Sequence, residues 1–388
     1  MRPMVMLLAL AAALAVTAAQ AVPHVPAADA VVLERLPEKI DPARRELRAL
    51  RAALARRPAD LDLAVRFARR AIEAAREDGD PRYLGQAQAA LDPWWRIAAP
   101  PVAVLVLRAT IRQSLHDFDG ALADLDALLA HDAGNGQALL TRATVLTVRG
   151  RYAEAMRDCA RLGTRGGALV LAACEAGPRS LAGDALPAYR ALVDALATGG
   201  EPAVREWALT LAAEIAARRA DDGAAEGHFR AALALDPRDP YLKAAYADFL
   251  LAAERAREVV ALLRDDGRND TLLLRLALAE GDIPERAAEY RAHRDELAAR
   301  FEAARRRGDA LHRREEARFR LALLGDAGGA AALARENWRV QREPADLALL
   351  VAAARAAGDP DGLRVAREWI AANRLEDAST RHALEAAR

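Results

Sequence analysis

The chain repeats its own pattern about every 34 residues, and this spacing limits the folds that it can adopt. A repeat of this length is one supersecondary unit, which cannot bury its apolar face until a neighbouring unit covers it. We therefore expect a linear array of stacked units. The same interval separates the members of four pairs of small or aromatic residues: Ala109 and Ala143, Phe118 and Tyr152, Ala121 and Ala155, and Ala213 and Ala247.

The composition favours helices and excludes several classes of protein. Aromatic residues make up only 4% of the chain, and alanine, arginine, leucine and glutamate dominate it, which argues for an all-α fold. A hydrophobic fraction of 53% is too high for a disordered chain. The 56 basic residues balance the 56 acidic residues, so the chain lacks the basic surface that a nucleic-acid partner requires.

The repeated residues resemble the tetratricopeptide repeat, a helix-turn-helix unit. Gly150, Tyr152 and Ala155 match the turn and second helix of that motif, and Phe229 and Pro237 match the end of a later unit. The resemblance implies an α-solenoid, a superhelix of about eight to ten stacked antiparallel helix pairs. In this family the first helix of each pair lines a concave groove that binds proteins or peptides. The family's lysine and asparagine clamp for a terminal carboxylate has no counterpart in this chain.

We expect five segments along the chain. Within residues 100–264 the sequence also predicts a turn at Gly177 and Pro178. Within residues 265–388 it predicts one long helix near residues 284–307. The segments are a signal peptide (1–21), an extended N-terminal segment (22–40), degenerate helical repeats (41–99), tetratricopeptide-like repeats (100–264) and C-terminal helical repeats (265–388).

The N-terminus has the pattern of a secretory signal. Arg2 precedes an apolar run that is too short to span a bilayer, and Ala19 and Ala21 form a small-x-small cleavage site. We expect cleavage after Ala21, with Ala28 and Ala30 as a second candidate site, and export from a bacterial cell to the periplasm or, alternatively, to the medium. The alternative to cleavage is an uncleaved membrane anchor. After cleavage the protein is not expected to be embedded in the membrane.

Cys159 and Cys174 are the only cysteines. They are expected on consecutive helices, and export places them in an oxidising compartment, so we predict a disulfide. The alternative is a pair of buried free thiols, which behave as small apolar residues. The two cysteines are too far apart in the sequence to form a CxxC redox site.

The sequence contains no catalytic motif, no phosphate-binding loop and no cluster of metal ligands, so we expect neither an enzyme nor a cofactor. The main hypothesis is an exported scaffold or adaptor that binds an unidentified protein or peptide in its groove. The alternative is a periplasmic protein that binds a small ligand or a metal, with His312, Glu315 and Glu316 as candidates. Alignment of the chain with the tetratricopeptide repeat places the following residues in the expected groove: Thr110, Gln113, Gln137, Thr144, Thr147, Trp207, Thr210, Glu214, Tyr241 and Asp248.

Overall fold

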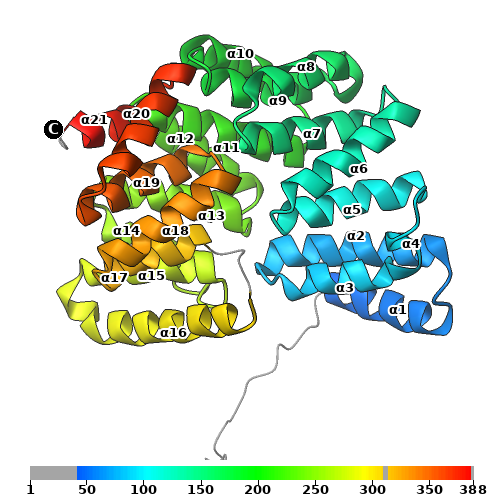
Figure 1. The fold of residues 1–388 in the computed structure, drawn as a ribbon, viewed down its shortest axis with the longest axis horizontal. Coiled ribbons are helices and arrows are strands. Elements are labelled where there is room, and N and C mark those ends of the chain that lie inside the picture. The colour runs from blue at the N-terminus through cyan, green and yellow to red at the C-terminus, as the bar shows by residue number, and fades with distance from the viewer. Residues whose placement is uncertain (1–41, 309–312, 386–388) are drawn as a thin grey trace, which may run out of the picture. The chain divides into compact units, whose positions relative to one another are not determined.

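The computed structural model describes residues 42–308 and 313–385, and these residues form helices and turns without a β-strand (Figure 1). The predicted signal peptide (1–21), the segment 22–40 and His312 lie outside the described residues. Residues 43–388 group as one unit by their contacts, and the description below concerns the described part of that unit. No described helix combines the length and the apolar character needed to cross a membrane.

Eighteen of the described helices form nine successive pairs whose members pack against each other, which confirms the expected α-solenoid. Three further helices lie outside the pairs: α1 (Pro42–Arg56), α4 (Asp92–Trp95) and α21 (Ala378–Glu385). The pairs are α2 (Leu61–Asp78) with α3 (Arg82–Ala90), α5 (Val102–Ser114) with α6 (Phe118–His131), α7 (Gly136–Val148) with α8 (Tyr152–Leu162), α9 (Ala168–Ser180) with α10 (Ala185–Ala197), α11 (Pro202–Arg218) with α12 (Asp222–Leu235), α13 (Pro240–Ala252) with α14 (Ala256–Leu263), α15 (Asp270–Gly281) with α16 (Ala287–Arg306), α17 (Arg313–Leu323) with α18 (Ala327–Val340), and α19 (Pro344–Ala357) with α20 (Pro360–Asn373).

The repeat interval is visible in the backbone. Helices α5 and α7 begin at residues 102 and 136, and α6 and α8 begin at 118 and 152, so each start is displaced by one repeat. The turns inside these pairs also share one feature, because each contains a residue with positive φ. These residues are His116 between α5 and α6 and Gly150 between α7 and α8, and, again one repeat apart, Ala220 between α11 and α12 and Glu254 between α13 and α14.

The repeated alanines mark places where helices approach closely. Ala109, Ala143, Ala213 and Ala247 are all buried, as are the aromatic residues Phe118, Tyr152 and Phe229. A methyl group lets neighbouring helices cross with little side-chain volume between them. The apolar core therefore extends along the array from pair to pair.

The C-terminal pairs return to the middle of the array. The backbone N–H of Arg342 donates to the carbonyl of Val148 at 2.8 Å, and the Arg149 guanidinium donates to the carbonyl of Val340 at 3.1 Å. Trp369 packs edge-on against Tyr152, with the ring centroids 6.1 Å apart. One apolar cluster contains Tyr152 together with buried residues of α17–α21. The segment between α18 and α19 thus closes against the turn between α7 and α8.

Two local predictions need correction. Helix α9 continues through Gly177 and Pro178 to Ser180, and the turn lies at residues 181–184, where Gly183 has a φ of +82°. Proline in the last turn of a helix removes one backbone donor but leaves the rest of the helix intact. The long helix begins later than expected, because Pro284–Arg286 forms a 3₁₀ turn before α16 (Ala287–Arg306). The predicted segment boundaries at 41–99, 100–264 and 265–388 stay predictions.

Candidate functional site

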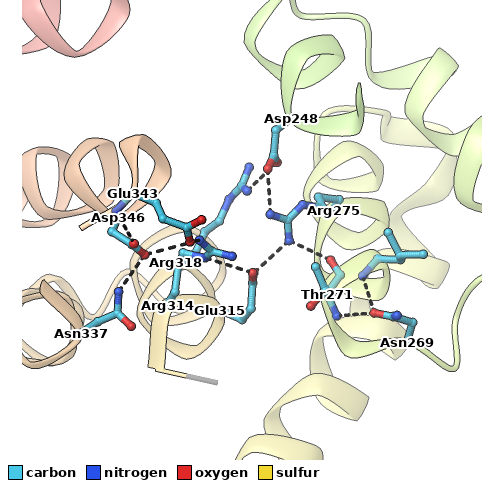
Figure 2. Close-up of polar contacts among 11 residues, drawn as sticks. Asp248, Asn269, Thr271, Arg275, Arg314, Glu315, Arg318, Asn337, Glu343 and Asp346 are labelled. Carbon is cyan, nitrogen blue, oxygen red and sulfur yellow. Dashed lines mark hydrogen bonds and ion pairs between the residues drawn. The ribbon is translucent and has the colours of Figure 1, made fainter. Parts of the chain in front are cut away.

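A cluster of ion pairs lies where α17 meets α13 and α15 (Figure 2). The Arg275 guanidinium donates to Asp248 Oδ2 at 2.7 Å and to Glu315 Oε2 at 2.9 Å. Arg318 donates to the other carboxylate oxygen of Asp248 at 2.6 Å. Arg275 is only 4% exposed and Glu315 only 5%, so this charge pair is almost fully removed from water. A buried charge is stable only when it is paired and hydrogen-bonded.

The same cluster continues from α17 to the start of α19. Arg314 donates to Glu343 Oε2 at 3.0 Å and lies 3.5 Å from Asp346 Oδ1. Asp346 also accepts from Asn337 Nδ2 at 2.8 Å and from the backbone N–H of Glu343 at 3.0 Å, which caps α19 (Figure 2). Below, the ion-pair cluster means the residues Asp248, Arg275, Arg314, Glu315, Arg318, Glu343 and Asp346.

The pKa values of the carboxyl groups in the cluster are shifted in opposite directions. Burial alone would raise the pKa of Asp248 and Glu315, but nearby guanidinium groups, Arg275 first, outweigh it and lower both values. Burial raises the pKa of Glu343 to about 7; Arg314 opposes this rise, and the neighbouring Asp346 and Glu214 add to it. Glu343 therefore changes its charge near neutral pH while Asp248 and Glu315 stay ionised.

Tyr241 of α13 is an exposed aromatic residue beside this cluster. Its side chain is 57% exposed, and its hydroxyl donates to Glu214 Oε1 of α11 at 2.7 Å. The neighbouring Glu214 charge raises the pKa of Tyr241, and burial raises the pKa of Glu214. The phenol–carboxyl pair thus presents an aromatic ring and an acidic group next to each other.

The predicted groove residues fall into two groups. Those on α5 and α7 bond only within their own helix: the hydroxyls of Thr110, Thr144 and Thr147 each donate to the carbonyl four residues earlier. Gln137 bonds to Thr141, again one turn away, and Gln113 is half-buried. These side chains are at least partly exposed. This part of the predicted groove is therefore not filled by hydrogen bonds to distant helices.

The predicted groove residues on α11 and α13 are largely engaged by the chain itself. Asp248 belongs to the ion-pair cluster, and Thr210 is 3% exposed with its hydroxyl bonded to Glu206. Trp207 is partly buried against the apolar core. Among the five predicted residues on these two helices, Tyr241 is the one that the structure leaves exposed, and it holds Glu214.

A disulfide joins Cys159 of α8 to Cys174 of α9, with the Cα atoms 5.7 Å apart. Both cysteines are buried in the apolar core between the two pairs. The bond therefore ties consecutive repeats together across the turn at Gly163–Gly166.

The candidate metal ligands do not converge. Glu315 bonds to Arg275, whereas Glu316 accepts from Arg305 and from Arg320 Nη2, the latter at 2.9 Å. His312 lies outside the described residues. Within the parts of the chain that are described, no group of three metal-ligating side chains occurs.

Most of the ion-pair cluster was not predictable as a site. Asp248 was predicted as a groove residue and Glu315 as a metal ligand, but Arg275, Arg314, Arg318, Glu343 and Asp346 resemble ordinary surface charges in the sequence. Arg318 and Asp248 are 70 residues apart, and no spacing rule links them. A capping pattern at Glu343 and Asp346 was the one local signal available.

The comparisons with known proteins add little. No family model matches the chain, and no curated protein matches it. Among solved structures, the crystal structure of the P58(IPK) TPR domain is similar at 18% sequence identity, covering 85% of this chain and 97% of that chain with a TM-score of 0.25. A superposition this loose carries no argument about function. The helix pairs described above define the class of protein, a helical-repeat array.

Proposed function

We propose that this chain is an exported scaffold of the tetratricopeptide type that binds a protein or peptide partner. The observation that carries the proposal is Tyr241, an aromatic side chain that is 57% exposed although its helix is part of the core. Tyrosine is among the residues that contribute most to protein interfaces, because it combines a large apolar ring with a polar hydroxyl. Glu214 orients this ring and offers a carboxyl group beside it.

The polar faces of α5 and α7 extend the proposed contact surface. Gln137 and Thr144 are exposed, and Thr110, Gln113 and Thr147 are half-buried. The threonine hydroxyls bond only to carbonyls of their own helix. Amide and hydroxyl groups of this kind can bond to a partner's backbone. Asp248 and Thr210 do not belong to the proposed surface, because Asp248 is paired with two arginines and Thr210 is buried.

The test is capture of partners from an extract of the envelope fraction, using the tagged chain and mass spectrometry. Tyr241→Ala should reduce the amount of specifically captured protein at least severalfold, because truncating an aromatic anchor typically costs more than about 1 kcal/mol of binding energy. Tyr290→Ala on α16 is the matched control, since Tyr290 is a half-buried tyrosine on a different helix. Equal capture by wild type, Tyr241→Ala and Tyr290→Ala would refute the role of Tyr241.

Export to the periplasm is the second part of the proposal. It rests on the apolar run after Arg2 and on the small residues Ala19 and Ala21, and a disulfide between Cys159 and Cys174 suits an oxidising compartment. The measurement is the N-terminal sequence of the protein recovered from the periplasmic fraction. A mature N-terminus at Val22 is expected, whereas protein that keeps Met1 and stays in the cytoplasmic fraction would contradict export.

A further inference from the structure

A cavity of about 260 Å³ lies where the turn between α2 and α3 meets α15 and α17. The two sides approach closely: a Cβ built on Gly79, whose φ is +64°, would lie 1.9 Å from Asn269 Nδ2. The cavity is smaller than a site for a drug-sized ligand but larger than a few waters need. Its polar lining comes from five separate segments and consists of Arg76, Ser114, His116, Thr271, Arg314, Glu315 and Gln341.

Gln341 is the unusual member of this lining. It is only 7% exposed, and its side-chain amide has no hydrogen bond to any other described residue. The fully enclosed side-chain atoms that lack a partner in the described part of the chain do not include those of Gln341, so its amide is reached from the cavity. One helical turn earlier, Asn337 is buried to the same degree and does have a partner, Asp346. The Gln341 amide therefore has unused donors and an unused acceptor facing the cavity.

The charges around the cavity leave one cation uncompensated. Glu315 is neutralised by Arg275, and Arg314 is bonded to Glu343. On α2 the acidic neighbours Glu73 and Glu77 both bond to Arg70. Arg76, which is exposed at the mouth of the cavity, has no acidic partner among the described residues.

The guanidinium of Arg76 at the mouth and the amide of Gln341 inside would bind two chemically different ends of a ligand. A guanidinium binds a carboxylate through two parallel hydrogen bonds. Gln341, with the hydroxyls of Ser114 and Thr271, can bond to an amide or a hydroxyl group. Pro81 and Leu84 supply an apolar wall against which a short aliphatic stem can pack.

We infer that this cavity binds a small organic acid of amino-acid size, with its carboxylate on Arg76 and its polar end on Gln341. This is a function in addition to the proposed partner binding, and it uses different residues. Its failure would leave the partner proposal untouched, because Tyr241 does not line the cavity.

The experiment is isothermal titration calorimetry of the full chain with three small acids: succinamate, succinate and L-glutamate. Succinamide, the uncharged diamide analogue, is the ligand control. Saturable binding at micromolar to millimolar concentration is expected for at least succinamate, which carries both a carboxylate and an amide, and none is expected for succinamide. If none of the three acids binds at millimolar concentration, or if succinamide binds equally well, the inference is wrong.

Two variants locate the site. Arg76→Gln should weaken binding about tenfold or more, whereas Arg69→Gln should not change it, since Arg69 is exposed on the same helix but does not line the cavity. Gln341→Leu should also weaken binding, yet its urea midpoint without ligand should not fall, because the replaced amide has no partner to lose. Unchanged binding in Arg76→Gln and Gln341→Leu would overturn the assignment to this cavity.

Discussion

Replacing Arg275 by methionine tests whether the ion-pair cluster holds α17 against α13 and α15. The guanidinium bonds to Asp248 at 2.7 Å and to Glu315 at 2.9 Å. Without it, Asp248 keeps Arg318, but the nearest remaining cation to Glu315 is Arg314, whose Nε is 3.6 Å away. Removing one partner of a buried pair costs about 3–5 kcal/mol, because the other charge stays buried and uncompensated. Methionine preserves much of the apolar stem, so the loss reflects mainly the missing charge.

The measurement is urea-induced unfolding followed by circular dichroism at pH 7. The matched control is Arg257→Met, because Arg257 and Glu285 are paired at 3.5 Å with both side chains exposed. Exposed pairs contribute between about 0 and 1 kcal/mol, so the control should unfold close to wild type. The double variant Arg275→Met/Glu315→Met should regain much of the loss, since an apolar pair can replace a buried ion pair.

The pH dependence of the Arg275→Met effect has a definite sign. In the wild type, burial would raise the pKa of Glu315, but Arg275 and Arg314 lower it, so its stabilising contribution is present above the ordinary pKa and is lost as the pH falls through the lowered value. In Arg275→Met the lowering effect of Arg275 on the pKa of Glu315 is gone, and burial raises this pKa. Glu315 of the folded variant therefore takes up a proton at a higher pH than in the wild type. The stability difference between the two proteins should therefore shrink as the pH falls below neutral. A difference under about 1 kcal/mol at pH 7, or a double variant no better than the single one, would refute the reasoning.

Three further predictions concern the disulfide, the turn at Gly150 and the protonation of Glu343. A thiol count under denaturing, non-reducing conditions should find none, and reduction of the bond between Cys159 and Cys174 should cost roughly 3 kcal/mol; two free thiols per chain would contradict the disulfide. Gly150→Ala should cost about 2–5 kcal/mol in urea unfolding, because φ is +73° and the new Cβ would lie 2.4 Å from Trp369, whereas Gly227→Ala in open space on α12 should be neutral or stabilising. Burial raises the pKa of Glu343 from 4.5 to about 7, so its contribution to stability is complete below 4.5 and is lost as the pH rises through 7; Glu343→Gln should flatten the stability profile over that range, and an unchanged slope would contradict the raised value.

The parts of the fold that repeat locally were predictable from the sequence. Ala143 and Tyr152 recur one repeat after Ala109 and Phe118, and each is buried at the helix contact that this spacing predicts. Helix pairing depends on neighbouring segments, so a single sequence carries enough information to predict it.

The contacts of the C-terminal pairs were not predictable from the sequence, and they alter the predicted groove. Val148 meets Arg342 and Asp248 meets Arg318 across long stretches of chain, and neither pair has a distinctive spacing. The register identified Tyr241 as a groove residue, but it could not show that Thr210 is buried or that Asp248 is neutralised by arginines. The unpaired amide of Gln341 is likewise a consequence of tertiary packing, because its neighbours in the cavity come from four other segments.

The array closes on itself through the segment between α18 and α19, which is hydrogen-bonded to the end of α7 and the turn after it. Hydrogen exchange of the Arg342 amide tests this closure most directly, because this residue lies outside the helices and its N–H donates, at 2.8 Å, to the carbonyl of Val148. Peptides spanning residues 341–343 should show a slowly exchanging amide at Arg342, and Gly150→Ala should abolish that protection. Exchange of the Arg342 amide at the rate of an unstructured peptide in the wild-type chain would contradict the closed arrangement.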